Sequence, residues 1–138
     1  MDTAVQALIN IDVPDLEPAI RFYEEAFGLR LSRKLFGGSV AEMTGTSVPI
    51  YLVTKPEGSS PILQSTQGRT YKRHWTPVHL DFVVDNIQMA IEKAERAGAK
   101  LEGKRQAFAW GSLATLSDPF GHGLCLLQWS GRDYDEVA

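Results

Sequence analysis

The sequence of 138 residues has a single cysteine, no long apolar run and no long basic stretch. Because Cys125 has no second cysteine with which to form a disulfide in the chain, a reducing, cytoplasmic compartment is expected. No apolar segment approaches the roughly 20 residues that cross a bilayer, so a membrane-spanning protein is excluded. The first residues also lack the basic and apolar blocks of a secretory signal. We therefore expect a cytoplasmic protein with no membrane partner.

The formal net charge is −3, and the cations form no stripe along the sequence. Nucleic-acid binding depends on cations that neutralise phosphates, so we expect no nucleic-acid partner. A hydrophobic content of 43% is ordinary for a globular protein. The length suits one domain over residues 1–138, and any internal duplication must share its core.

One helix pattern occurs twice in the sequence. Asp15 and Asp85 stand at the expected starts, and Gly28 and Gly98 stand at the expected ends. Aspartate can accept hydrogen bonds from the free N–H groups of a first turn, and glycine readily takes the left-handed conformation of a helix end. The interval from aspartate to glycine is the same in both copies, which indicates a duplication. The residues expected on the apolar helix faces are Ala19, Phe22, Tyr23, Ala26 and Phe27, then Ile87, Ala90, Ile91 and Ala94.

Segments with strand-like composition flank each helix. The expected strands are 5–13, 29–36, 39–44 and 49–54 in the first copy, and 78–84, 100–106, 112–117 and 124–129 in the second. The run Asp118-Pro119-Phe120-Gly121 predicts a tight turn before the last strand. The pattern therefore predicts two βαβββ modules. Their expected ranges are 4–54 and 78–130, with a linker over 55–77 and a polar tail over 131–138.

Two motifs resemble those of a known superfamily. The string Asp15-Leu16-x-x-Ala19-Ile20-x-Phe22-Tyr23-x-x-x-Phe27-Gly28-Leu29 resembles the opening of vicinal oxygen chelate proteins, which include glyoxalases, bleomycin resistance proteins and extradiol dioxygenases. The Asp118-Pro119-x-Gly121 turn before the final strand resembles them too. The resemblance implies an α+β fold in which two βαβββ modules form curved mixed sheets around a cup. It also implies a small-molecule ligand on the concave side and a homodimer.

The resemblance further implies four metal-ligand positions, occupied in the superfamily by histidine and glutamate. In this sequence they carry Leu8 (or Ile9, if the register slips by one), Tyr51, His79 and Cys125. Leucine and isoleucine cannot bind metal, tyrosine is a poor ligand at neutral pH, and Cys125 replaces a glutamate. His79 is the only retained ligand position. We expect no cofactor, and a divalent metal only if an altered site forms.

An altered metal site is one alternative. Asn10 and Asp12 share the strand parity of Leu8, and Asp81 shares that of His79, so His79, Asp81 and Asp12 could form such a site. Exposed or salt-bridged aspartates at strand ends are the commoner arrangement. His79 is either a general base or ligand-orienting donor, or a hydrogen-bonded histidine without a catalytic role.

Strand alternation also predicts which side chains line the cup. Tyr51, Cys125, Leu127 and Trp129 fall on alternate positions and could provide apolar and aromatic surface, although core packing is favoured for Leu127. Cys125 could act as a nucleophile only with His79 as its base. The expected ligand-binding residues are Tyr51, His79, Cys125, Trp129, Asn10 and Trp110.

Three further features have open interpretations. His122 lies between two glycines and either closes over a ligand or, more commonly, is a solvated turn residue. Phe108, Trp110 and Gly111 could cover a pocket or meet a partner subunit. A basic cluster in the linker could attract an anionic ligand, although such clusters are more often solvated surface. Its members are Arg69, Lys72, Arg73 and His74.

Together these residues predict a glyoxalase and bleomycin-resistance-like protein that binds a small, hydrophobic or aromatic molecule without the usual metal quartet and without turnover. The alternative is a lyase, isomerase or dioxygenase of the same superfamily. It would use an altered divalent-metal site or His79 as a general base. Both remain open, because one fold supports several chemistries.

Overall fold

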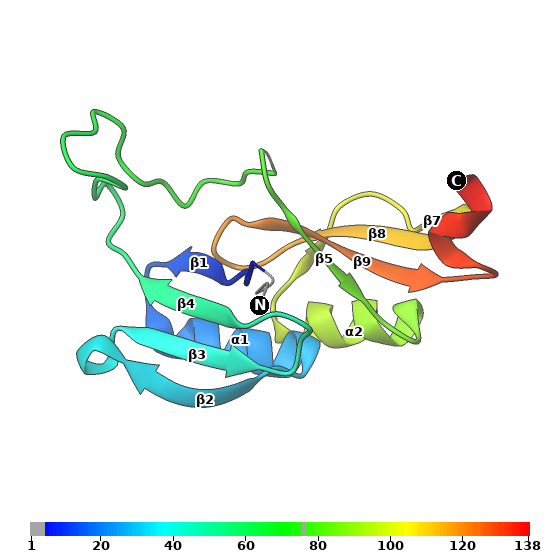
Figure 1. Ribbon diagram of the computed structural model, residues 1–138, viewed down its shortest axis with the longest axis horizontal. Coiled ribbons are helices and arrows are strands. Elements are labelled where there is room, and N and C mark those ends of the chain that lie inside the picture. Colours follow the sequence, from blue (N-terminus) through cyan, green and yellow to red (C-terminus); the bar gives the residue numbers. More distant parts are fainter. Residues whose placement is uncertain (1–4, 76) are drawn as a thin grey trace. The chain divides into compact units, whose positions relative to one another are not determined.

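The computed structural model describes residues 5–75 and 77–138. The predicted start of the first module at residue 4, and one position of the predicted linker, therefore lie outside the described residues. The chain divides into two compact units (Figure 1). One comprises the residues up to Glu24 together with Gly28–Thr70, and the other comprises Glu25–Phe27 and Tyr71–Ala138.

The first unit contains a four-stranded mixed sheet and most of one helix. Its elements are β1 (Ile9–Val13), α1 (Leu16–Phe27, the last three residues of which belong to the second unit), β2 (Arg30–Leu35), β3 (Val40–Thr44) and β4 (Ile50–Thr54). The strand order is β1-β4-β3-β2, with β1 parallel to β4 and the other pairs antiparallel. A short 3-10 turn, Phe36–Gly38, joins β2 to β3.

Strand alternation divides this sheet into an apolar and a polar face. Ile11 and Leu52 are register partners across β1 and β4, and both are buried. Asn10 and Tyr51 are the adjacent partners and point to the opposite face, because successive side chains of a strand alternate. Tyr23, in the part of α1 that belongs to this unit, is completely buried.

The predicted ends of α1 are confirmed in position. Asp15 is the N-cap, with an extended backbone, but its side chain makes no capping hydrogen bond within the described residues. Gly28 has a φ of 71°, and its N–H donates to Glu24 O at 3.0 Å. The helix therefore ends where a left-handed glycine satisfies a terminal carbonyl.

The second unit has the same order of elements, except that the strand after its helix is divided into two. Its elements are β5 (Leu80–Val83), α2 (Ile87–Ala97), β6 (Lys100–Leu101), β7 (Gln106–Phe108), β8 (Gly111–Ser117), β9 (Gly123–Trp129) and a short 3-10 helix, Asp133–Val137. The strand order is β5-β9-β8-β6, with β7 also paired to β8. Only β5 and β9 run parallel among the described strands of this sheet. The predicted α+β fold with two duplicated modules is confirmed.

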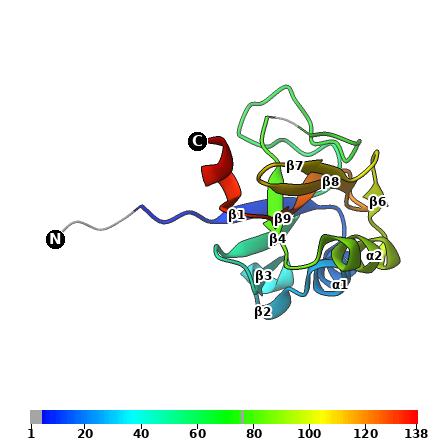
Figure 2. The ribbon, with the colours of Figure 1, turned by 90° about the vertical axis from the view of Figure 1, so that its right-hand side faces the viewer.

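Helix α2 covers one face of the second sheet (Figure 2). Leu116 on β8 and Leu124 and Leu126 on β9 are buried. They share that face by alternation, and Ile91 of α2 is buried as well. Gln128 Oε1 accepts a hydrogen bond from the Ile87 N–H at 2.8 Å, which ties the start of the helix to β9. The candidate site lies on the opposite face of the sheet, away from α2.

Two predicted boundaries were wrong. The first strand begins at Ile9, because β4 begins at Ile50 and offers no partner to the exposed residue Val5. The second helix is capped by Asn86 rather than Asp85. Asn86 accepts a hydrogen bond from the Met89 N–H at 3.1 Å, which is the bond that a cap requires.

The predicted strand 100–106 is also wrong as a continuous element. It divides into β6 and β7, and both pieces pair with β8. Gly103, between them, has a φ of 86°, a conformation that strands do not adopt and that favours glycine.

The predicted turn at Asp118 is confirmed as the connection between β8 and β9, which pair antiparallel. Its carboxylate accepts hydrogen bonds from the N–H groups of Phe120 and His122, at 2.8 and 2.9 Å. No helix within the described residues has the length and apolar character needed to cross a membrane.

Candidate functional site

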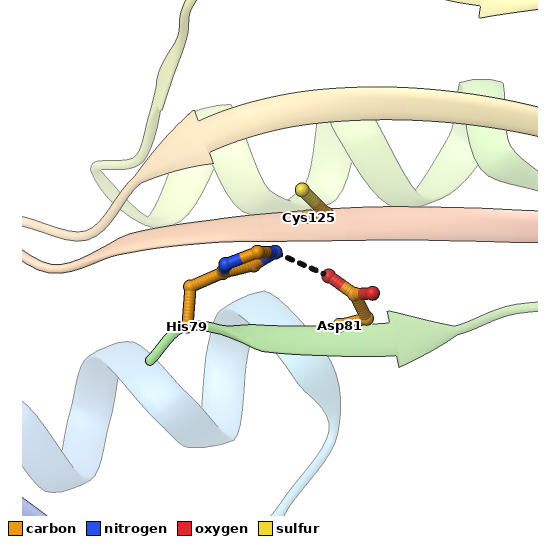
Figure 3. A group of neighbouring side chains, drawn as sticks. All are labelled: His79, Asp81 and Cys125. Carbon is orange, nitrogen blue, oxygen red and sulfur yellow. Dashed lines mark ion pairs between the residues drawn. The ribbon is translucent and has the colours of Figure 1, made fainter. Parts of the chain in front are cut away.

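The strand register of the second unit brings together three side chains with different chemistry. Asp81 on β5 lies directly opposite Cys125 on β9, and His79 precedes Asp81 by two residues. His79 Nε2 lies 3.2 Å from Asp81 Oδ1 (Figure 3). The nitrogen, oxygen and sulfur atoms that these residues offer all lie within 4.8 Å of one another. The structure thus groups an imidazole, a carboxylate and a thiol on the sheet face away from α2.

The three groups differ in exposure and charge. The side chains of His79 and Asp81 are each 40% exposed, whereas Cys125 is buried. Burial raises the pKa of the Cys125 thiol to about 12, and the nearby Asp81 carboxylate adds to the shift. Because the thiolate is the reactive form of cysteine, this environment opposes a nucleophilic role for Cys125. The neutral thiol behaves instead as a small, weakly polar apolar group.

Trp75, which was not predicted from the sequence, borders this group. Its ring centroid lies 5.5 Å from that of His79, in an edge-to-face arrangement. Its indole N–H donates to Glu102 Oε1 at 3.1 Å, and the Arg73 guanidinium lies 4.5 Å from its ring centroid. The indole rests on β9 at Gly123, where an added β-carbon would come within 2.4 Å of Trp75 Cδ2.

One signal in the sequence could have indicated this contact. Gly123 is the first residue of a strand and does not have a positive φ, so the backbone does not require glycine there. A glycine in such a position often marks the close approach of another group. That group is a residue of the predicted linker, and no local pattern identifies which one.

The basic cluster of the linker is partly used for ion pairs. Arg73 Nε lies 2.7 Å from Glu102 Oε2, and a second guanidinium nitrogen also contacts the Glu102 carboxylate. Arg69 Nε lies 2.7 Å from Asp12 Oδ2, and its guanidinium also donates to the Ser60 carbonyl at 2.9 Å. Arg69 therefore ties the linker to β1 in the first unit, and Arg73 ties it to the segment that follows β6 in the second unit.

A polar row crosses the first sheet on the face that carries Asn10 and Tyr51. Glu42 on β3 lies opposite Tyr51, and the Tyr51 hydroxyl donates to Glu42 Oε2 at 2.9 Å. Arg33 Nε lies 2.9 Å from Glu42 Oε1. Hydrogen bonds from Arg33 and Tyr51 lower the pKa of Glu42, and the bond to Glu42 raises the pKa of Tyr51. Tyr51 is thereby held as a neutral phenol.

These contacts bear on the metal positions that the superfamily uses. Leu8 is exposed and has no donor atom, and the Tyr51 hydroxyl is bound to Glu42. The described residues therefore do not fit the four-ligand set of the superfamily. Asp12, the third member of the altered site considered from the sequence, is paired with Arg69. Cys125, rather than Asp12, is the group that the structure places beside His79 and Asp81.

Four aromatic rings form a cluster at the end of β9. Trp110 and Trp129, both predicted ligand residues, have ring centroids 6.0 Å apart. Phe108 stacks on Trp110 at 5.2 Å with an interplanar angle of 5°. Tyr134, from the predicted polar tail, lies 4.6 Å from Trp129 and 5.3 Å from Trp110. The tail thus supplies an aromatic residue that was not predicted from the sequence to be part of a site.

Residues 8–127 match the family model described as a glyoxalase-like domain. This chain belongs to the glyoxalase-like domain family. The predicted relation to the vicinal oxygen chelate superfamily is therefore confirmed. No curated protein sequence matches this glyoxalase-like chain significantly.

Solved structures share the fold of the glyoxalase-like chain. A glyoxalase/bleomycin resistance protein/dioxygenase family enzyme from Burkholderia phytofirmans PsJN has a TM-score of 0.68 at 18% identity, covering 89% of this chain and 97% of its own. FosX, a fosfomycin resistance protein from Listeria monocytogenes, has a TM-score of 0.70 at 17% identity and full coverage of both chains. TnmS3, an antibiotic binding protein from Streptomyces sp. CB03234, has a TM-score of 0.65 at 24% identity, covering 94% of this chain and 99% of its own.

The second unit of the glyoxalase-like chain also has a cavity of about 410 Å³. Its walls carry cations at Arg73 and Lys100 and carboxylates at Glu102 and Asp118. Arg73, from the predicted basic cluster, lines it, whereas Tyr51, His79, Cys125, Trp129, Asn10 and Trp110 do not. The charges of the two signs are equal in number, so the cavity has no evident preference for an anion or a cation.

His122 packs against the linker of the glyoxalase-like chain. Its ring centroid lies 5.0 Å from that of His74 and 6.4 Å from that of Tyr71. Burial lowers the pKa of His74, and the neighbouring His122 contributes to the shift. These contacts give His122 a packing role beyond a solvated turn.

Proposed function

We propose that this glyoxalase-like protein binds a small hydrophobic or aromatic molecule on the sheet faces that lie away from its helices, without the superfamily's metal quartet and without turnover. The main support for the proposal is that neither metal-ligand position of the first module offers a ligand. Leu8 has no donor atom, and the Tyr51 hydroxyl is bound to Glu42. A metal held as in the superfamily would lack both first-module ligands.

The side chains on these faces suit an aromatic ligand. In the second unit Trp129 and Trp110 offer aromatic surface, and Cys125 is a buried neutral thiol. His79 supplies an imidazole that can exchange hydrogen bonds with a ligand's polar group. In the first unit Asn10 and Tyr51 supply polar atoms beside one another. The face of the second unit therefore combines aromatic and apolar surface with a polar group at His79, a mixture that is typical of small-molecule sites.

The names of two similar structures support this class of function. TnmS3 is described as an antibiotic binding protein, and FosX as a fosfomycin resistance protein. Both share the fold with this chain at below 25% identity, so they support the class of function and do not identify a ligand.

A thermal-shift screen of chelator-treated protein against a panel of planar aromatic compounds and antibiotics tests the proposal. A ligand that binds only the native state raises the unfolding temperature in a concentration-dependent way. Each hit is then incubated with the protein, extracted and analysed by mass spectrometry. We expect the compound to be recovered unchanged, and accumulation of a product would contradict binding without turnover.

An enzyme of the lyase, isomerase or dioxygenase type is the second candidate. It is favoured by the 3.2 Å contact between His79 Nε2 and Asp81 Oδ1, because a carboxylate can orient a histidine that acts as a base. This candidate predicts a turnover activity that His79→Ala abolishes and Asp81→Asn reduces. A turnover rate unchanged in His79→Ala would exclude it.

We also propose that the protein is a homodimer, as the superfamily resemblance implies. Sedimentation equilibrium at micromolar concentration measures the mass directly. Twice the mass of one chain is expected, and a monomer over the whole accessible concentration range would contradict the proposal.

A further inference from the structure

We infer that His79, Asp81 and Cys125 form a binding site for one thiophilic divalent cation of the Zn²⁺ type, with all three protein ligands supplied by the second module. This site differs from the superfamily's set, because Asp81 is not at one of its four positions. The first-module positions, Leu8 and Tyr51, take no part. The inference goes beyond the proposed function, since binding of an apolar molecule does not require a metal.

The donor set suits zinc. Imidazole nitrogen, carboxylate oxygen and thiolate sulfur are its three common protein ligands, whereas magnesium and calcium prefer oxygen alone. In a tetrahedral site with bonds of about 2.0 Å, two N or O ligands lie about 3.3 Å apart. His79 Nε2 and Asp81 Oδ1 lie 3.2 Å apart, so these two atoms already have the separation that a tetrahedral zinc site requires.

The sulfur completes the set with a small movement. All three donor atoms lie within 4.8 Å of one another, and a zinc-bound thiolate lies about 3.5 Å from neighbouring N or O ligands. The remaining difference between 4.8 Å and about 3.5 Å is at most about 1.3 Å, which is within the reach of side-chain rotation. On binding, the cation displaces the thiol proton of Cys125, which is released to solvent.

The backbone holds these donors in place. Asp81 and Cys125 are register partners on neighbouring parallel strands, so their spacing is set by the sheet. His79 is held from the side by the edge-to-face contact with Trp75. Groups that contact a ligating histidine orient it and commonly tune metal affinity. Three protein ligands leave a fourth position for water or for a donor atom of a bound small molecule.

Cobalt provides a direct test, because Co²⁺ replaces Zn²⁺ in tetrahedral sites and its absorption reports the ligands. Chelator-treated full-length protein is titrated with Co²⁺, and bound metal is measured by equilibrium dialysis. We expect one equivalent, visible absorption bands of tetrahedral strength and a near-ultraviolet band from the thiolate-to-cobalt transition. Binding of no metal, or binding without the thiolate band, would overturn the inference.

Substitutions then assign the ligands. Cys125→Ser is expected to abolish the thiolate band, and Asp81→Asn and His79→Gln are expected to weaken Co²⁺ binding at least tenfold. His122→Gln is the control, because His74 and His122 lie with ring centroids 5.0 Å apart and could hold a metal adventitiously. It is expected to leave binding unchanged, and loss of binding in this variant would overturn the inference. Circular dichroism of the metal-free variants establishes that each is folded.

The same preparations separate this inference from the proposed function. If an aromatic compound binds chelator-treated protein but the protein takes up no Co²⁺, the proposed function is supported and the metal site is overturned. Co²⁺ binding with the expected bands, in a protein that binds no compound of the panel, would support the metal site and count against the proposed function.

Discussion

The indole of Trp75 occupies the space that a side chain at position 123 would need. A β-carbon added to Gly123 would lie 2.4 Å from Trp75 Cδ2 and 2.6 Å from Trp75 Cε2. Real β-carbons do not make such contacts, so Trp75 can occupy this position only because residue 123 is a glycine. Trp75 in turn contacts the ring of His79, so Gly123 also affects the surroundings of His79.

Gly123→Ala is expected to destabilise the fold by about 1–3 kcal/mol, because the added methyl group must displace an aromatic ring. Urea unfolding measures the change. Trp75→Ala removes the ring, so adding Gly123→Ala to that variant is expected to cost much less. Equal costs of Gly123→Ala in the two backgrounds would contradict the contact, because a double-mutant cycle reports coupling only when the residues interact.

Cys125 is expected to make the stability of metal-free protein fall at alkaline pH. The folded-state pKa of its thiol, about 12, exceeds the ordinary value of about 8.5 for an unfolded thiol. The folded state therefore holds this proton more tightly, and the stabilisation is complete below about pH 8.5 and is lost as the pH rises toward 12. The pH-dependent stabilisation by Cys125 is measured by comparing the unfolding free energies of wild type and Cys125→Ser between pH 8 and pH 11. A difference independent of pH would contradict the assignment.

Glu42→Gln is expected to lower the pKa of Tyr51. The hydrogen bond that the Tyr51 hydroxyl donates to the Glu42 carboxylate is the largest cause of its raised pKa. Replacing the carboxylate with a neutral amide removes the charge that opposes phenolate formation. Ultraviolet difference titration of wild type and variant, with Tyr51→Phe to identify the signal, measures the shift. An unchanged titration of Tyr51 would show that the bond is absent in solution.

Tyr134→Ala is expected to expose the aromatic cluster at the end of β9. Its ring contacts both Trp110 and Trp129, and aromatic pairs contribute about 0.5–1.5 kcal/mol each beyond area burial. We expect a red shift of tryptophan emission and a loss of about 1 kcal/mol or more. Val137→Ala, an exposed neighbour, is the control and is expected to change neither quantity. Identical emission spectra for Tyr134→Ala and wild type would contradict the contact.

Features specified by a few adjacent residues were predictable from the sequence. Gly28 and Gly98 were correctly assigned to the helix ends, where both have positive φ. The Asp118 turn was also predicted, because its carboxylate accepts hydrogen bonds from residues only two and four positions later. The predicted cap Asp85 was wrong by one position, because aspartate and asparagine are both good caps and residue type alone does not distinguish such neighbours.

The candidate site was only partly predictable. Strand alternation indicated that His79 and Asp81 share a face, and the parallel pairing of β5 with β9 adds Cys125 to them. Trp75 and Glu102 were missed, because they are placed by a hydrogen bond between residues 27 positions apart and by the packing of Trp75 on Gly123. No local pattern specifies such contacts.

Mapping a thermal-shift hit on chelator-treated, isotope-labelled protein by NMR tests the proposed function most directly. The proposal predicts saturable shifts of the amide signals of residues on the faces away from the helices, with Tyr51, His79, Cys125 and Trp129 among them, and recovery of the compound unchanged. Shifts confined to the outer surfaces of α1 and α2, or conversion of the compound during the measurement, would contradict it.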